Sequence, residues 1–201
     1  MASRNYRLGR RQAAADRTRA AILAAARDLL TAGGPALSAA AVAKRAGVSR
    51  ITVYNRFGSK AGLLRELAET ARGAGTSRSD QQAEEPRERL RQRIAASCSM
   101  WSADPALFRR LDAIGNLDMS TSGEDRMLAE ELAAADQLRP GCSLKEAEDV
   151  IGALTSFDVF DRLHKDGRRS TAAVSDILMR LAATLLSSES ASPGWAGFPR
   201  R

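Results

Sequence analysis

The 201-residue chain has few of the residues that build metal sites, disulfides and acid–base centres. Its one histidine is His164, and its two cysteines, Cys98 and Cys142, lie far apart with no other Cys or His at metal-ligand spacing. The pattern predicts no metal site and identifies both cysteines as small buried residues in a reducing compartment. A disulfide or redox pair is the alternative interpretation.

The sequence also lacks signals for a membrane or for secretion. No apolar run approaches the roughly 20 residues that cross a bilayer. The basic segment at residues 1–16 is followed by an amphipathic segment that carries Arg27 and Asp28, not by an apolar signal core. We therefore expect a cytoplasmic or nucleoid-associated protein with no membrane partner.

An enzyme is not expected either. A glycine-rich phosphate loop is missing, and no cluster of acids and bases stands out around the single histidine. A small helical enzyme remains an alternative, but the sequence predicts no catalytic residues and no cofactor.

Charge is unevenly distributed along the chain. The whole chain carries a net charge of +7, and counting residues 1–80 alone gives 15 Lys and Arg against 5 Asp and Glu. The remaining residues are mildly acidic. A basic end on an acidic body is expected where one end binds a polyanion such as DNA, although an unstructured basic tail on a soluble protein would give the same count.

The apolar pattern predicts an all-α protein with a small head. Residues 1–16 are basic with little apolar content, so we expect a flexible arm there, disordered or lying along phosphates or in a minor groove. Residues 17–32 have apolar residues at spacings of three and four, as in a helix. Three short helices should follow, each with a serine at its N-cap: from Ser38 to Gly47, at 50–55 and at 60–72.

The rest of the chain predicts a helical body. Residues 73–85 are small and polar and read as a linker, and residues 86–190 form the body, before a tail at 191–201. Helical periodicity recurs over five segments, namely 86–102, 105–116, 124–137, 143–165 and 170–188. No strand-like alternation of useful length occurs.

Residues 37–60 have the composition of a helix-turn-helix. Gly47 suits the turn, which needs a residue that tolerates positive φ, and small apolar residues surround it. This stretch contains no Asp or Glu, which would repel phosphate. The outward residues of the second helix can hydrogen-bond bases or phosphates, and these are Ser49, Arg50, Thr52, Tyr54 and Asn55.

Residues 17–72 resemble the DNA-binding domain of the TetR family of bacterial regulators. The resemblance runs without gaps through Ala32-Gly33-Gly34, Val42-Ala43, Ala46-Gly47-Val48-Ser49, Thr52-Val53-Tyr54, Phe57, Ser59-Lys60 and Leu63-Leu64. It implies phosphate contacts by Ser38, Tyr54 and Lys60, and base contacts by Arg50, Thr52 and Asn55. Arg56 stands where the family often has histidine and adds a possible phosphate contact. Each of these residues could instead be an ordinary surface side chain, and Tyr54 a half-buried helix aromatic.

The last two predicted helices, 143–165 and 170–188, are apolar along one face and should form an antiparallel hairpin. In TetR-like proteins this hairpin pairs with its two-fold mate as a four-helix bundle, so the resemblance implies a homodimer on a palindromic operator. The recognition helices would then lie about 34–36 Å apart. The same apolar faces could instead complete the core of a monomer.

The resemblance also implies a small-molecule effector bound within the body. Bulky apolar residues near helix ends are the candidates for its pocket, and each could equally be plain core: Trp101, Phe108, Met119, Phe157 and Phe160. The leading hypothesis is a sequence-specific transcriptional regulator, usually a repressor in this family, that a ligand releases. A nucleoid-type protein that binds DNA by charge alone is the alternative.

Overall fold

The computed structural model describes residues 2–33, 37–75, 85–115 and 122–186. The described residues are helical without a β-strand, and one isolated bridge joins Leu138 to Leu186. The all-α prediction is therefore confirmed. The chain divides into two compact units: a head of residues 1–74 and 104–118, and a body of residues 75–103 and 119–201.

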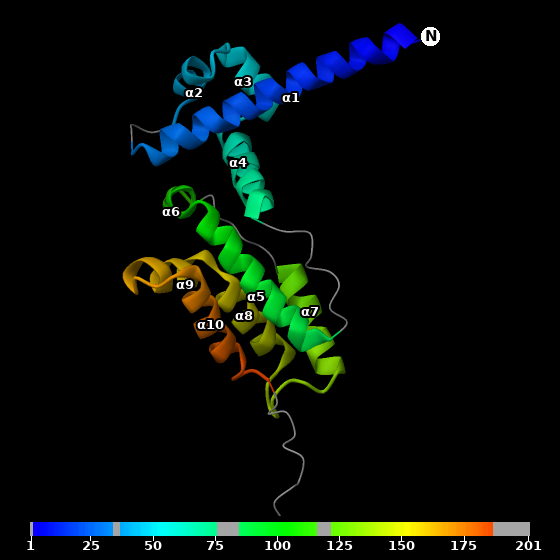
Figure 1. Cartoon of the computed structure of the whole chain (residues 1–201), viewed down its shortest axis with the longest axis vertical. Helices are drawn as coiled ribbons and strands as arrows, with labels where there is room; N and C mark the ends of the chain where they lie inside the picture. The colour runs from blue at the N-terminus through cyan, green and yellow to red at the C-terminus, as the bar shows by residue number, and fades with distance from the viewer. Residues whose placement is uncertain (1, 34–36, 76–84, 116–121, 187–201) are drawn as a thin grey trace, which may run out of the picture. The chain divides into compact units, whose positions relative to one another are not determined.

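The head contains five helices among its described residues: α1 (Ala2–Thr31), α2 (Ala39–Ala46), α3 (Arg50–Phe57), α4 (Lys60–Gly75) and α6 (Pro105–Ala113). α2 packs against both α1 and α3, as Figure 1 shows. The apolar side chains between these helices are almost completely buried, for example Ile22, Val42 and Val53. These three successive helices thus share one small core.

Serine side chains start the short helices, as the sequence predicted. The hydroxyl oxygen of Ser38 accepts the N–H of Ala41, that of Ser49 accepts the N–H of Thr52, and that of Ser59 accepts the N–H of Gly62. Each bond satisfies one of the N–H groups that a helix leaves without an internal partner. The third helix extends to Phe57 and the fourth to Gly75, beyond the expected ends at 55 and 72.

The expected flexible arm is wrong for residues 2–16, which form the first half of α1. Alanine, arginine and glutamine are good helix formers, and residues 2–31 contain no proline and only one glycine, Gly9. A helix is about 10 Å wide and the minor groove about 6 Å. If the helical arm meets DNA, its arginines would lie along phosphates, which stays a prediction.

α6 belongs to the head and not to the body, where the sequence placed it. Arg27 of α1 donates from Nε to Oδ2 of Asp104 across 2.6 Å, and Asp104 also caps α6 by accepting the N–H of Leu107. α6 follows α5 after this single residue, so the periodicity of the two helices gives no sign that they belong to different units.

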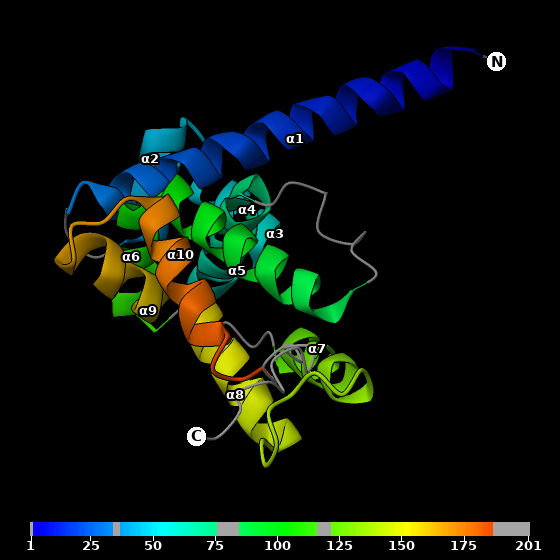
Figure 2. The same ribbon diagram turned by 60° about the horizontal axis from the view of Figure 1, so that its bottom comes forward.

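The body contains α5 (Pro86–Ala103), α7 (Ser122–Ala134), α8 (Leu144–Thr155), α9 (Phe157–Asp161), a π-helical turn η1 (Arg162–Asp166) and α10 (Thr171–Ala182). α5 contacts α7, α8 and α10, an arrangement visible in Figure 1 and again in Figure 2. Buried Leu90, Ile94 and Trp101 of α5 occupy the centre of this unit. The predicted tail and most of the predicted linker lie outside the described residues.

The single helix expected at 143–165 is also wrong, because the chain breaks at Ser156. This residue is extended, with φ −72° and ψ 152°, and its hydroxyl oxygen accepts the N–H of Val159 at the start of α9. The hydroxyl of Thr155 donates back to the carbonyl oxygen of Ile151. Local side-chain bonds of this kind compete with a continuous helix, so α8 and α10 are joined through α9 and η1. α10 ends at Ala182, before the expected residue 188.

The two cysteines have different environments. Cys98 of α5 is buried, whereas Cys142 is half-buried and its thiol lies 3.6 Å from the carbonyl oxygen of Ser143. Both are free thiols. The prediction of burial is therefore confirmed for Cys98 only.

Candidate DNA-binding surface

The turn between α2 and α3 depends on Gly47. This residue has φ +67° and ψ 31°, the left-handed conformation that side chains disfavour. The N–H of Gly47 donates to the carbonyl oxygen of Lys44, and the N–H of Val48 donates to the carbonyl oxygen of Ala43. The chain can therefore reverse within three residues and start α3 at Arg50, which confirms the predicted role of Gly47 in the turn.

The eight residues of α3 fall into four pairs, each with the spacing i, i+4 that places two side chains on one side of a helix. Val53 and Phe57 form the buried pair, with 3% and 8% of their surfaces exposed. At 100° per residue, the pair opposite the core is Ile51 and Asn55. Arg50 and Tyr54 occupy one flank, and Thr52 and Arg56 the other.

The outward side chains of the helix-turn-helix are available to a ligand. Five polar side chains of this surface form no hydrogen bond or ion pair within the part of the chain that the structure describes. They are Arg50, Tyr54, Asn55, Arg56 and Lys60. All five residues are exposed. Three cationic groups without carboxylates beside them form a surface suited to phosphate.

The hydroxyl groups of the surface are arranged differently. Those of Ser38 and Ser49 accept backbone N–H groups as caps, and the Ser38 hydroxyl keeps its own hydrogen to donate to a phosphate oxygen. Thr52 is half-buried, and its hydroxyl lies 2.8 Å from that of Ser49. We therefore place Thr52 at the edge of the outward face and not at its centre.

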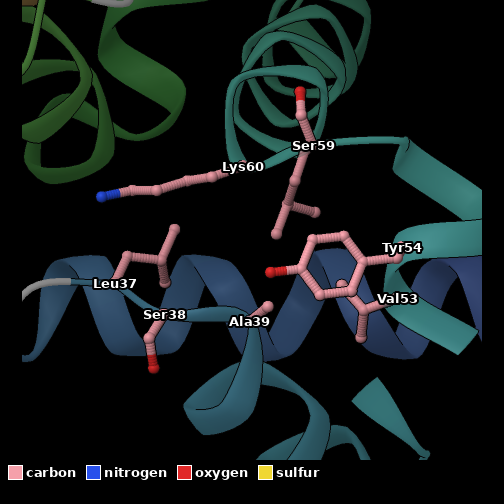
Figure 3. A pocket seen from close by; sticks show the side chains of 8 residues that line it. Leu37, Ser38, Ala39, Val53, Tyr54, Ser59 and Lys60 are labelled. Carbon is pink, nitrogen blue, oxygen red and sulfur yellow. The ribbon is translucent and has the colours of Figure 1, made fainter. Parts of the chain in front are cut away.

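A small hollow lies beside the flank formed by Arg50 and Tyr54. Figure 3 shows the side chains that line it, and they come from the start of α2, from α3 and from the start of α4: Leu37, Ser38, Ala39, Val53, Tyr54, Ser59, Lys60 and Leu63. The hollow brings together the three residues that the family resemblance implied as phosphate contacts, Ser38, Tyr54 and Lys60. Figure 3 shows that the polar ends of these three side chains point in different directions, so each suits a separate contact to the DNA backbone.

Ile51 was not among the predicted site residues. Its exposed fraction is 70%, the largest of the exposed large apolar side chains among the described residues. The pattern could have revealed it, because Ile51 shares a side of α3 with Asn55 and stands opposite the buried pair.

The residues proposed for a ligand pocket are distributed over both units of the chain. Trp101 and Phe157 of the body are buried with ring centroids 5.3 Å apart, and the Trp101 indole N–H donates to the carbonyl oxygen of Thr155. Phe160 is buried and stacks on His164. Phe108 is buried on α6 of the head, and Met119 lies outside the described residues. A pocket lined by these residues stays a prediction.

Across the described ranges, no three His, Cys, Asp or Glu side chains lie close enough together to hold a metal ion. No described helix is both long enough and apolar enough to span a bilayer.

A protein-family model matches part of the head. Residues 22–67 match the family model described as bacterial regulatory proteins, tetR family. No curated protein sequence matches the chain.

Solved structures match over most of the chain. NalD of Pseudomonas aeruginosa, described as the secondary repressor of a multidrug efflux pump, is 22% identical with a TM-score of 0.62, over 86% of this chain and 97% of its own. A TetR-family transcriptional regulator of Haemophilus influenzae, HI0893, is 20% identical with a TM-score of 0.63, over 88% and 100%. FadR of Bacillus subtilis, solved with stearoyl-CoA, is 18% identical with a TM-score of 0.62, over 82% and 97%. At these identities the likeness shows a shared fold.

Proposed function

Because this chain belongs to the tetR family of bacterial regulatory proteins, which are DNA-binding transcriptional regulators, we propose that it is a repressor. It binds a palindromic operator as a homodimer, and a small molecule bound in the body releases it. The observation that carries the proposal is the outward face of α3, where exposed polar and cationic side chains stand free of carboxylates.

The proposed contacts divide into two classes. Tyr54, Lys60 and Ser38, which line the hollow, contact backbone phosphates and fix the position of the head on the duplex, while Arg56 binds a phosphate on the other flank. Asn55 reaches an adenine edge from the centre of the outward face, and Arg50, although it lies on a flank, is proposed to reach a guanine edge through its long side chain. Phosphate contacts set affinity and its salt dependence, and base contacts set sequence preference.

Apolar side chains left exposed on α8 and α10 support the homodimer. Leu144 of α8 is 49% exposed and Leu181 of α10 is 46% exposed. A second copy would cover these faces as a four-helix bundle. Replacing Leu181 by Glu should give a monomer in sedimentation, whereas Met127→Glu, at an exposed position of α7, should leave a dimer.

The proposed effector is an apolar small molecule. Large aromatic side chains gather in the body, with Trp101, Phe157 and Phe160 all buried, and FadR of Bacillus subtilis was solved with stearoyl-CoA. Only Asp104 separates α5 of the body from α6 of the head, so a displacement of α5 would pass directly into the unit that binds DNA.

A competition assay tests the function. Duplexes selected from a random library should bind the protein about 10³-fold or more tightly than random competitor. Asn55→Ala should reduce that ratio by about tenfold or more, since one good base contact contributes about 1–3 kcal/mol. Arg126→Ala on α7 of the body is the matched surface control and should leave the ratio unchanged. Equal affinity for all duplexes would instead favour the nucleoid-type alternative.

A further inference from the structure

We propose that Ile51 reads the 5-methyl group of a thymine in each half of the operator. This proposal rests on the proposed function, because it names the chemistry of one contact on the surface that binds DNA. Ile51 is 70% exposed, although it is a large branched aliphatic residue.

A single exposed aliphatic side chain is ordinary at a protein surface. The position of Ile51 distinguishes it. Ile51 and Asn55 form the pair of α3 that is opposite buried Val53 and Phe57, so they occupy the centre of the outward face. The flanks carry the groups suited to phosphate, Tyr54 on one side and Arg56 on the other. When a helix enters a groove, its central outward line meets base edges and its flanks meet the two strands.

Ile51 also lies in the right part of the helix. It is the second residue of α3, and recognition helices contact bases chiefly with their N-terminal residues. Its neighbour Thr52 is less suited, because its hydroxyl lies 2.8 Å from the Ser49 hydroxyl and the residue is half-buried.

The major groove offers one apolar group, the 5-methyl of thymine. The other base-edge groups there are hydrogen-bond donors and acceptors, which an isoleucine side chain cannot satisfy. Because Asn55 occupies the same side of α3 and asparagine pairs best with adenine N6 and N7, this face suits neighbouring A·T pairs.

The test uses the full-length protein and duplexes selected from a random library. In the selected sequence, each recurring thymine is replaced by deoxyuridine, which lacks only the methyl group. Replacement of one particular thymine in one half-site should reduce the affinity of the wild-type protein about fourfold. This is the ratio that corresponds to one buried methyl group. Replacing both symmetry-related thymines should reduce the affinity about fifteenfold.

Variants assign the methyl contact to its residue. Ile51→Ala should bind the thymine and deoxyuridine duplexes equally, and Met127→Ala, which truncates an exposed apolar side chain of α7, should discriminate between them as the wild type does. Ile51 contributes little to the core, so circular dichroism should show unchanged helix content for Ile51→Ala. Three results would each overturn the proposal while leaving the proposed function intact. The selected duplexes could contain no recurring thymine, the wild type could bind thymine and deoxyuridine duplexes equally, or Ile51→Ala could discriminate between them as the wild type does. Failure to select any preferred duplex would overturn the proposed function itself.

Discussion

The side-chain hydroxyls of Ser49 and Thr52 lie 2.8 Å apart at the first turn of α3. The same Ser49 oxygen accepts the backbone N–H of Thr52 at 3.0 Å. These two bonds fix the start of the helix that carries Arg50, Ile51 and Asn55. The geometry of the base-contacting face therefore depends on Ser49, which lies just before that helix.

Replacing Ser49 by Ala should therefore affect both stability and DNA binding. Loss of an N-cap serine costs about 1 kcal/mol of unfolding free energy, measurable by urea denaturation. Ser143, which caps α8 by accepting the N–H of Glu146, provides the matched control. Ser143→Ala should lose similar stability and keep its affinity for a selected duplex, whereas Ser49→Ala should lose affinity too. Equal affinities in the two variants would contradict a positioning role for Ser49.

Lys60 should contribute to the salt dependence of binding. Each phosphate contact that is lost reduces the slope of log K against log salt by about 0.9, and a dimer has two copies of Lys60, so Lys60→Gln should reduce it by about 1.8. Arg126→Gln removes one charge per protomer from the body, where Arg126 pairs with Glu130, and should not alter the slope. If both variants changed the slope alike, net charge and not a phosphate contact would explain the effect.

The ion pair of Arg93 and Asp125 should stabilise the body. Nε and Nη2 of Arg93 donate to Oδ1 of Asp125 at 2.8 and 2.6 Å, and the Asp125 side chain is only 4% exposed. Asp125→Ala would leave the Arg93 guanidinium without its most buried partner and should cost about 3 kcal/mol of unfolding free energy.

The control for this ion pair is the exposed pair of Lys145 and Asp149 on α8. Exposed pairs contribute about 0.5 kcal/mol or less, so Asp149→Ala should be nearly neutral in the same denaturation experiment. A neutral Asp125→Ala would show that α5 and α7 do not depend on this contact.

The Cys98 thiol should be unreactive in the folded protein. Burial raises the pKa of Cys98 to about 11, and a hydrogen bond with Ser175 offsets this only in part. Because the thiolate is the reactive form, iodoacetamide at pH 8 should label half-buried Cys142 in the native protein and Cys98 only after unfolding. Mass spectrometry of the two peptides separates the sites, and rapid native labelling of Cys98 would contradict its burial.

The same pKa shift gives a pH dependence of stability. The folded state holds the thiol proton more tightly than the unfolded chain, whose thiol titrates near its ordinary pKa of roughly 8.5. The contribution of the protonated Cys98 thiol to the free energy of unfolding is therefore complete below the pKa of the unfolded chain. It is lost as pH rises through about 11. Cys98→Ala should remove this part of the alkaline loss of stability.

The helix-turn-helix was predicted closely because its signals are local. Serine caps, Gly47 and the spacing of Val53 and Phe57 act within a few residues, so the sequence alone indicates helices, turn and buried side. The exposure of Ile51 follows from the same spacing, but an apolar residue is readily assigned to the core when only its type is considered.

The body was predicted less well because its breaks depend on competing contacts. The apolar period of residues 143–165 continues across Ser156, and nothing in that period shows that Ser156 caps a new helix. The membership of α6 in the head depends on contacts such as that of Arg27 with Asp104, which are separated by 77 positions in the chain. Local periodicity carries no information about pairings over such distances.

Methylation interference on a selected duplex tests the central claim, that α3 reads bases from the major groove. Dimethyl sulfate modifies guanine N7 in the major groove and adenine N3 in the minor groove. We predict that N7 methylation blocks binding at two clusters separated by about one helical turn, and that N3 methylation within those clusters has little effect. Binding that is indifferent to N7 methylation, or sensitive only to N3 methylation, would contradict the account.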